Sequence, residues 1–221
     1  MEAALFFIFA AKIGGDSAIV IQQFIMSDIK TVSVFCASSS HVPQVYMDDA
    51  FRMGRLLASR GIRVITGGGF RGLMASVEEG ALSNGGKVTA VIPQFMVSAG
   101  WLHKDLNDVH ITNDMQERKK LMIDESDAVI ILPGGCGTLD EAMEVLTLKQ
   151  LGLYLKPVVF LNTNGFYDLL TKHLERLVAE KFMKPDHLLL WAVANTPEEL
   201  IKLVYELPDW DARCGKLTEI Q

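Results

Sequence analysis

Short apolar runs alternate with longer amphipathic runs along most of the chain after Asp28. The short runs are nearly continuous stretches of apolar, often β-branched residues, which is typical of parallel strands buried on both faces. The predicted strands cover residues 31–36, 63–66, 87–92, 128–132 and 157–161, with a further extended piece within 188–193.

The longer runs repeat their apolar positions with a helical period. The predicted helices cover residues 45–60, 73–83, 114–125, 139–151, 166–180 and 197–206. Strands that alternate with helices in this way form βαβ units around a parallel sheet. We therefore expect a Rossmann-like doubly wound α/β fold, with helices on both faces of the sheet, in one domain over residues 26–221.

Two segments do not fit this alternation. Residues 93–109, with Trp101, are longer than a usual connection and have no clear period. They either cover a site or form a surface excursion with Trp101 packed underneath. Residues 1–25 contain ALFFIFAA after Glu2, so they are either a secretion signal with an acidic start or an upstream extension. We expect an extension that is disordered or not native to the working protein, and the run is too short to span a bilayer.

Composition narrows the class of protein. Of 221 residues, 49% are hydrophobic and 22% charged, which fits one folded domain. The net charge of −6 argues against a nucleic-acid partner, because phosphate-backbone binding needs a basic surface. The three cysteines, Cys36, Cys136 and Cys214, show no CxxC spacing, so neither a zinc site nor a disulfide framework is indicated, and a reducing cytoplasm fits best.

Ligands of doubly wound sheets bind beyond the carboxyl ends of the strands, where three loops of this chain converge: residues 37–40, 67–72 and 133–138. The second loop matches G-x-G-x-x-G between a strand and a helix. A dinucleotide site also needs a carboxylate about 20 residues later, but the next strand ends in VIPQ. A nicotinamide cofactor is therefore disfavoured, and no GxxxxGK[ST] motif for a triphosphate occurs.

The third loop, PGGCGT, predicts a monophosphate site. Its glycines let backbone N–H groups approach an anion, and the helix expected to begin at Thr138 directs its positive dipole end there. The alternative is that these glycines form only a tight turn between strand and helix.

Glu141 has two interpretations. With Thr138 it forms a T-x-x-E pattern typical of a capping box. Alternatively it faces the ribose, where a carboxylate stabilises positive charge developing at C1′ or orients water for attack.

Arg118 lies near the start of the helix before the fourth strand, where Asn113 and Gln116 could form the cap. Its guanidinium could reach a phosphate or a leaving base at the same edge as Gly134. The alternative is that Arg118, Lys119 and Lys120 form a solvated basic face.

The residues together resemble the LOG (LONELY GUY) family of cytokinin riboside 5′-monophosphate phosphoribohydrolases, often labelled "lysine decarboxylase-like". The resemblance runs from Val34 to Tyr167 through VFCASSS, ITGGGFRGLM, VIPQFM, MQERK, PGGCGTLDE, EVLTLKQLG and KPVVFLN. The family's signature arginine and glutamate fall on Arg118 and Glu141. Pyridoxal-phosphate decarboxylation has no support, because no lysine and ring-nitrogen partner are specified.

The resemblance implies hydrolysis of the N-glycosidic bond of an adenosine-type nucleoside 5′-monophosphate, without a metal or organic cofactor, by a homodimer with sites near the subunit interface. Arg118 and Glu141 are the expected catalytic residues. The candidate substrate- and phosphate-binding residues are Ser39, Gly68, Gly69, Lys119, Gly134, Gly135, Gly137, Thr138, Asp140 and Thr147.

This chain departs from many relatives, which have histidine at the position of Gln116, glycine at that of Ala75, and a glutamate where this chain has SAGW at 98–101. The departures leave the base open, so plain AMP or another purine monophosphate is an alternative substrate. A nucleotide-binding or carrier module that uses the same loops without cleavage is the alternative function.

Overall fold

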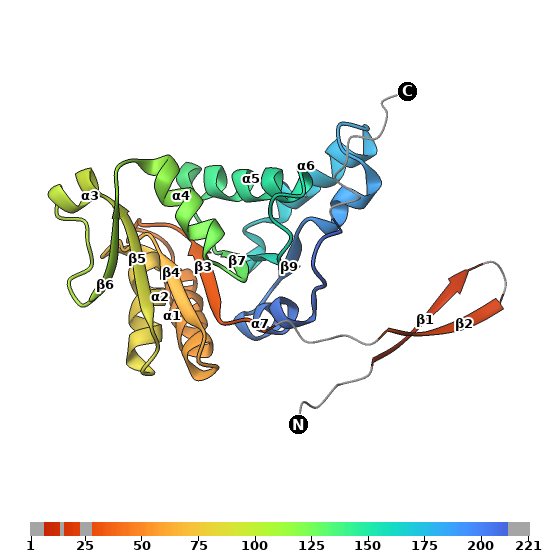
Figure 1. Cartoon of the computed structure of the whole chain (residues 1–221), viewed down its shortest axis with the longest axis horizontal. Helices are drawn as coiled ribbons and strands as arrows, with labels where there is room; N and C mark the ends of the chain where they lie inside the picture. Colours follow the sequence, from red (N-terminus) through yellow and green to blue (C-terminus); the bar gives the residue numbers. More distant parts are fainter. Residues whose placement is uncertain (1–6, 14–15, 23–27, 212–221) are drawn as a thin grey trace.

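The computed structural model describes residues 7–13, 16–22 and 28–211 (Figure 1). Its main sheet has seven strands, all parallel, in the order β6-β5-β4-β3-β7-β8-β9. The strands are β3 (Thr31–Phe35), β4 (Arg63–Thr66), β5 (Val88–Pro93), β6 (Asp108–Thr112), β7 (Ala128–Ile131), β8 (Val158–Leu161) and β9 (Ala192–Ala194). The chain moves outward from β3 to β6 and then returns to β7, beside β3. The predicted doubly wound fold is confirmed, and its switch point lies between β3 and β7.

Helices cover both faces of the sheet (Figure 1). They are α1 (Gln44–Ser59), α2 (Gly72–Ser83), α3 (Gln94–Ser98), α4 (Met115–Asp124), α5 (Cys136–Gln150), α6 (Asp168–Ala179) and α7 (Pro197–Glu206), with short 3₁₀ turns η1 (Thr163–Gly165) and η2 (Pro185–Leu189). Each face has its own buried cluster. Met53, Val77 and Leu200 of α1, α2 and α7 belong to one, and Met122 and Val145 of α4 and α5 to the other.

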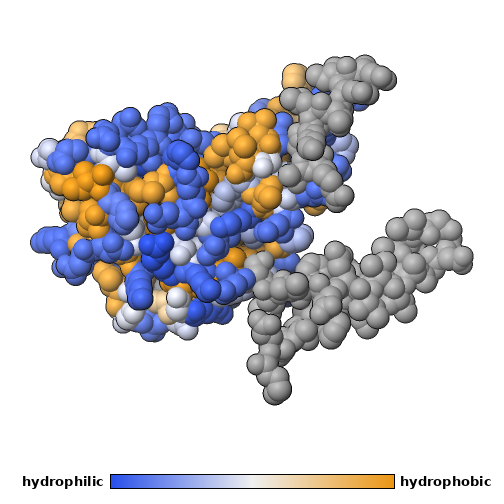
Figure 2. Space-filling model, viewed as in Figure 1, coloured by the Kyte–Doolittle hydropathy of each residue, from blue (hydrophilic) through white to orange (hydrophobic). Residues whose placement is uncertain are grey.

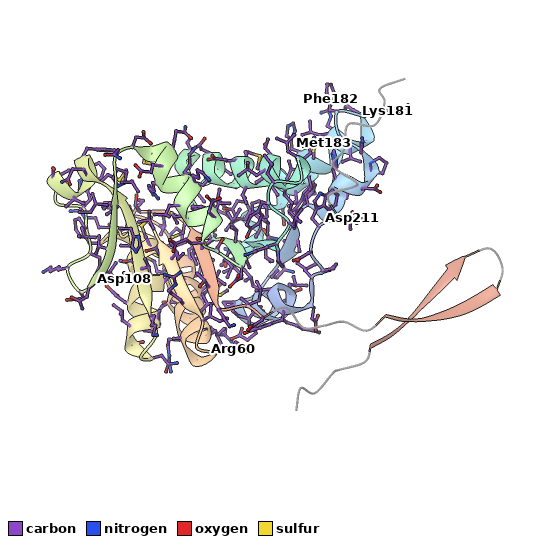
Figure 3. All side chains as sticks on the ribbon, in the orientation of Figure 1. Arg60, Asp108, Lys181, Phe182, Met183 and Asp211 are labelled. Carbon is purple, nitrogen blue, oxygen red and sulfur yellow. The ribbon has the colours of Figure 1, made fainter. Side chains whose placement is uncertain are left out.

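Neighbouring residues of a strand point to opposite faces of the sheet, so a single strand contributes side chains to both clusters. Ala128 and Ile130 of β7 pack in the cluster of α1, α2 and α7. Val129 and Ile131 pack in the cluster of α4, α5 and α6. Side chains fill the space on either side of the sheet (Figure 3). The nearly continuous apolar runs therefore reflect burial on two faces.

The segment 93–109, expected to lack regular structure, contains α3 and leads into β6. Strand β6 lies at the edge of the sheet, and three of its five residues, Asp108, His110 and Ile111, are exposed. An edge strand needs no continuous apolar run, which is why the hydrophobic pattern missed it.

Within the predicted N-terminal extension, β1 (Phe7–Ile13) pairs with β2 (Asp16–Gln22) in an antiparallel hairpin. Gly14 and Gly15, between two apolar runs, were the sequence signal for it. The boundary at residue 26 stays a prediction. Among the described residues, no helix is long and apolar enough to cross a membrane.

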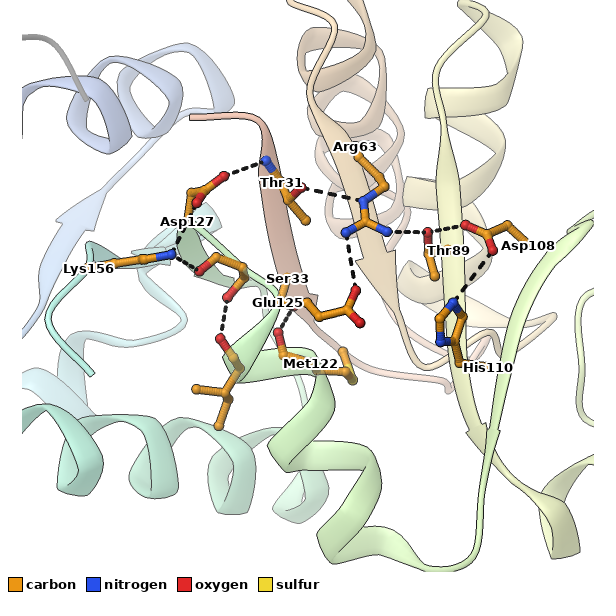
Figure 4. Close-up of polar contacts among 12 residues, drawn as sticks. Thr31, Ser33, Arg63, Thr89, Asp108, His110, Met122, Glu125, Asp127 and Lys156 are labelled. Carbon is orange, nitrogen blue, oxygen red and sulfur yellow. Dashed lines mark hydrogen bonds and ion pairs between the residues drawn. The ribbon is translucent and has the colours of Figure 1, made fainter. Parts of the chain in front are cut away.

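A polar network joins the strands at their amino ends (Figure 4). Arg63 donates to the Thr31 and Thr89 hydroxyls at 3.4 Å each and pairs with Glu125 at 3.2 Å. Asp127 accepts the backbone N–H of Thr31 at 3.0 Å. These contacts join the strands at their amino ends. The glycine-rich loops lie at the opposite, carboxyl edge of the sheet.

Candidate active site

The three predicted loops meet at the carboxyl edge of the sheet. The Ala37 N–H donates to the Pro133 carbonyl at 3.1 Å, and the Met74 N–H donates to the Ala37 carbonyl at 3.2 Å. A Cβ on Gly72 would lie 2.5 Å from the Ser39 carbonyl oxygen. Ser39 is exposed, and its hydroxyl accepts the His41 N–H at 3.3 Å. The loops therefore form one continuous surface.

The glycines at 67–69 pack closely against their neighbours, and the geometry requires glycine at Gly68. A Cβ on Gly67 would lie 2.5 Å from Arg118 Nη2, and one on Gly68 would lie 2.7 Å from the Ala90 Cβ. Gly68 also has a φ of +68°, which other residues rarely adopt. A Cβ on Gly69 would lie 2.9 Å from the Met74 sulfur. The G-x-G-x-x-G match thus has a packing explanation independent of a dinucleotide.

Helix α5 begins at Cys136 with Gly135 as its N-cap, two residues before the predicted start at Thr138. No side chain caps it, so the capping-box interpretation of Thr138 and Glu141 is wrong. Glycines at the turn let the backbone enter the helix earlier, which places Thr138 inside the first turn.

The glycines of this turn differ in their surroundings. A Cβ on Gly134 would lie 2.1 Å from the Thr138 hydroxyl, whereas a Cβ on Gly135 or Gly137 would meet no atom within 4 Å. The fold itself therefore does not require glycine at 135 and 137. Both positions lie at the start of α5, where helix geometry favours an anion.

Arg118 of α4 and Glu141 of α5 form a buried ion pair at this edge. Arg118 Nη2 lies 3.0 Å from Glu141 Oε1, and each side chain is only 7% exposed. Arg118 Nη1 contacts the Met115 sulfur at 3.5 Å. Within the described part of the chain, the buried Arg118 Nε has no hydrogen-bond partner. Arg118 is thus a buried cation whose Nε–H group is not used by any of the described residues.

The alternative prediction of a solvated basic face is wrong for two of its three residues. Arg118 and Lys119 are buried, whereas the Lys120 side chain is 74% exposed. Lys119 Nζ lies 2.9 Å from Asp140 and 2.7 Å from Glu144, so it joins α4 to α5. Lys119 and Asp140 are therefore paired with each other.

The predicted cap of α4 is also wrong. Asp114 is the N-cap, and its carboxylate accepts the backbone N–H groups of Gln116 and Glu117 at 2.8 and 2.9 Å. Asn113 instead donates its backbone and side-chain N–H groups to the Glu117 carboxylate, at 2.8 Å each. A carboxylate is the stronger acceptor for the helix amides, which places the cap one residue later.

A pocket of about 440 Å³ opens beside Arg118. Its lining includes Gly67, Gly69, Met74, Met96 and Trp101, and Phe70 and Arg71 also border it. Segment 93–109 therefore borders a pocket. The segment is held there by the Phe70 N–H, which donates to the Trp101 carbonyl at 3.2 Å, and by the His103 N–H, which donates to the Gly68 carbonyl at 2.8 Å.

Comparison with known proteins identifies the family. Residues 74–204 match the family model described as "Possible lysine decarboxylase". The chain is 38% identical over 187 residues to the probable cytokinin riboside 5′-monophosphate phosphoribohydrolase LOGL2 of Oryza sativa subsp. japonica, covering 84% of this chain and 76% of that protein. It is also 38% identical to the cytokinin riboside 5′-monophosphate phosphoribohydrolase LOG1 of Arabidopsis thaliana, covering 87% and 89%. The chain belongs to the LOG family.

Solved structures share the fold of this LOG-family chain. The X-ray structure of TM1055 has a TM-score of 0.63 and 26% identity, covering 80% of this chain and 98% of that one. The molybdenum cofactor carrier protein of Chlamydomonas reinhardtii has a TM-score of 0.63 at 22% identity, covering 81% and 98%. At that identity the second likeness concerns the fold alone.

The Arg118–Glu141 pair has unusual electrostatics. Burial raises the pKa of Glu141 to about 7, against the opposing effect of the Arg118 charge. Asp140 adds to the increase. Near neutral pH the Glu141 carboxyl is therefore present in both protonation states, which suits a group that acts at a reacting centre.

Among the candidate substrate- and phosphate-binding residues, Thr147 is the one that the fold places away from the rest of the site. It is exposed on α5, and its hydroxyl donates to the Met143 carbonyl at 2.7 Å. Eleven residues separate it from the start of the helix at Cys136, a rise of about 16 Å. Thr147 therefore lies far from the loop at 133–138 of its own chain.

The structure adds residues that the sequence analysis did not single out. Phe70, Arg71 and Met74 border the pocket, and Glu78 lies fully buried in α2 near the glycine-rich loop. The sequence signal for Glu78 was weak, since it lies beside Glu79 in a helix whose apolar positions include Leu73, Val77 and Ala81. Among the described residues, no group of three or more His, Cys, Asp or Glu could hold a metal ion.

Proposed function

We propose that this protein hydrolyses the N-glycosidic bond of an adenosine-type nucleoside 5′-monophosphate and releases the free base and ribose 5-phosphate. The observation that carries the proposal is the buried Arg118–Glu141 pair beside the pocket, with Arg118 Nε unpaired among the described residues. The names of the relatives in rice and Arabidopsis support the same reaction class.

The phosphate binds at the start of α5. A Cβ on Gly135 or Gly137 would meet no atom within 4 Å, no side chain caps the helix, and its first turn carries no acidic residue. Backbone N–H groups and the helix dipole together favour a phosphate at such a terminus. With the phosphate there, the ribose lies toward Glu141, one turn further along the helix.

Water attacks C1′ as the bond from C1′ to the base nitrogen breaks, and the base departs with a proton. The transition state carries positive charge on the sugar, as in other glycoside cleavages. Ionised Glu141 stabilises that charge or orients the water, and Arg118 anchors the substrate through its free donor. Burial keeps these interactions strong because little water screens them.

The pocket receives the base. Met74, Ile92, Met96 and Trp101 give it an apolar lining, and Trp101 is half exposed at its rim. Such a lining suits a purine and also an apolar substituent on it. Plain AMP and an N6-modified AMP are therefore both candidate substrates.

We also propose that the protein works as a homodimer in the cytoplasm. Leu139, Met143 and Thr147 are spaced four residues apart on α5, and Leu151 continues the spacing at the C-cap of the helix; each is at least partly exposed. Apolar surface is visible over α5 and α6 (Figure 2). A second copy seated on this face would bring its own Thr147 toward the site of its partner. The two cysteines in the described residues, Cys36 and Cys136, are free, as a reducing compartment allows.

The test is release of base from a panel of purine nucleoside monophosphates, including AMP and N6-prenyl AMP, each compared with its dephosphorylated nucleoside. We expect release from the monophosphates and at least tenfold lower kcat/KM for the nucleosides. Thermal stabilisation by AMP with no base released would instead indicate a carrier module and would refute the proposal. Equal rates for nucleotide and nucleoside would refute the phosphate site at α5.

A further inference from the structure

Glu78 is a carboxyl in the interior that the proposed reaction does not use. It is 0% exposed, and Oε1 accepts the Thr66 hydroxyl at 2.6 Å. Its other oxygen, Oε2, has no hydrogen-bond partner among the described residues. Burial raises the pKa of Glu78 to about 8 against the effect of the Thr66 hydrogen bond, so the carboxyl is neutral at neutral pH.

Thr66 connects this carboxyl to the glycine-rich loop. The Thr66 hydroxyl, which donates its proton to Glu78, accepts the backbone N–H of Gly68 at 3.1 Å. Without an acceptor at position 78, the hydroxyl would lose the partner that fixes its orientation. A hydroxyl held by two hydrogen bonds therefore sets the position of the Gly68 amide.

The loop in turn contacts the guanidinium. Gly67 packs so tightly on Arg118 that a Cβ there would lie 2.5 Å from Nη2, the same nitrogen that pairs with Glu141. Movement of the Gly67 backbone thus changes the space in which the Arg118–Glu141 pair forms. Glu78, Thr66, the Gly67–Gly68 backbone and Arg118 form one continuous series of contacts.

We propose that Glu78 is a positioning residue: acting through Thr66, it holds the backbone of the glycine-rich loop against Arg118 and so keeps the guanidinium on Glu141. The inference rests on the function proposed above for the Arg118–Glu141 pair. Glu78 touches no substrate in this scheme and acts only through its neighbours.

The pKa of Glu141 reports on this role. The Arg118 charge lowers that pKa, and Lys119 lowers it further, while Asp140 and Glu144 raise it. If the loop relaxes and Arg118 moves away, the pKa of Glu141 must rise. A variant that only destabilises the fold reduces the folded fraction but leaves this pKa unchanged.

The experiment titrates Glu141 by carboxyl ¹³C NMR in the full chain, with the signal assigned by its loss in Glu141→Gln. The disrupting variants are Glu78→Leu and Thr66→Val, which keep approximate volume and remove a hydrogen-bonding group. The conservative variants are Glu78→Gln and Thr66→Ser. Glu175→Gln, on the exposed face of α6, is the control for the charge change. Thermal unfolding identifies the variants that fold.

We expect the pKa of Glu141 to rise by about one unit in Thr66→Val and in Glu78→Leu, and to stay at the wild-type value in Glu78→Gln, Thr66→Ser and Glu175→Gln. Since Thr66 is never charged, its effect cannot come from a lost charge. An unshifted pKa in folded Thr66→Val, or a shift in Glu78→Gln as large as in Glu78→Leu, would overturn the inference. The titration needs no turnover, so failure of the wild-type protein to release base would count against the proposed function alone.

Discussion

At the scale of single residues, Glu141 carries the chemistry of the proposed reaction. Its carboxyl is buried against Arg118, and only its ionised form can stabilise a cationic sugar. Replacing Glu141 with Gln keeps the shape and removes the charge. We expect Glu141→Gln to retain thermal stability and to lower kcat for base release by roughly 100-fold or more, with Glu175→Gln as the unaffected control. Base release at the wild-type rate would remove Glu141 from the mechanism.

The same residue sets a pH dependence. Burial raises the pKa of Glu141 to about 7, so the ionised fraction increases as the pH rises through that value. We expect kcat/KM to increase between pH 6 and pH 8 with an apparent pKa near 7. Rate measurements on AMP across this range check it, and a profile that is flat there would exclude ionisation of Glu141 as the controlling step.

Glu78 has a separate consequence for stability. Its pKa is raised from the usual 4.5 to about 8 in the folded protein, so the folded state holds this proton more tightly than the unfolded state. Stability therefore decreases as the pH rises from about 4.5 to about 8. Glutamine at position 78 cannot ionise, so the Glu78→Gln variant does not undergo this decrease in stability. We expect the Tm of Glu78→Gln, relative to wild type, to be higher at pH 8.5 than at pH 5, and a difference that does not vary with pH would contradict this.

At the scale of elements, the turn at the start of α5 contains two kinds of glycine. The fold requires Gly134, whereas Gly137 serves the proposed phosphate site. A methyl group at Gly137 meets nothing and replaces a poor helix former, whereas one at Gly134 collides with Thr138. We expect Gly137→Ala to gain up to about 1 kcal/mol of stability while KM for AMP rises, because the methyl group crowds the phosphate. Gly134→Ala should lose stability.

Thermal unfolding and the ratio of kcat/KM for AMP to that for adenosine measure both effects. An unchanged ratio in stable Gly137→Ala would mean that the phosphate does not bind over this turn.

The elements that the sequence predicted well are those whose burial is strong and uniform. Strands β3, β4, β5, β7 and β8 lie inside the sheet and appear as apolar runs, so each was found within a residue or two. The exposed edge strand β6 and the short helix α3 carry no such pattern and were missed. Likewise, the placement of Arg118 and Glu141 at one edge of the sheet followed from topology and family resemblance, whereas their ion pair was not predicted. The contact of Thr66 with Glu78 depends on side-chain placement that periodicity does not contain.

At the scale of the whole molecule, several large apolar side chains after the start of α5 are exposed. Leu151 and Leu153 follow α5 and are 54% and 72% exposed, and Leu169 of α6 is 81% exposed. Phe182, at the end beyond α6, is 75% exposed (Figure 3). Solitary exposed leucines are ordinary, so the proposed interface rests on the α5 series Leu139, Met143 and Thr147 with Leu151 at its C-cap, and not on Leu169 or Phe182.

The two-fold dimer through α5 that we propose would make each site depend on both chains. We expect the wild-type protein to elute at about twice the chain mass of 24.4 kDa, and Leu151→Lys to shift it toward monomer, with Leu169→Lys as the control off the α5 series. Light scattering on the eluted peak measures the mass. A monomeric wild-type protein, or a dimeric Leu151→Lys, would place the interface elsewhere.

Subunit mixing then tests whether Thr147 serves the partner's site, because its position about 16 Å along α5 from Cys136 keeps it from its own. Thr147→Arg and Glu141→Gln should each be inactive alone. In a mixed dimer, the chain with intact Glu141 faces the intact Thr147 of its partner, so one of its two sites is complete. Random exchange of equal amounts should therefore restore about a quarter of wild-type activity. No recovery after exchange, with mixed dimers demonstrated by mass spectrometry, would show that Thr147 does not complete the site of the other chain.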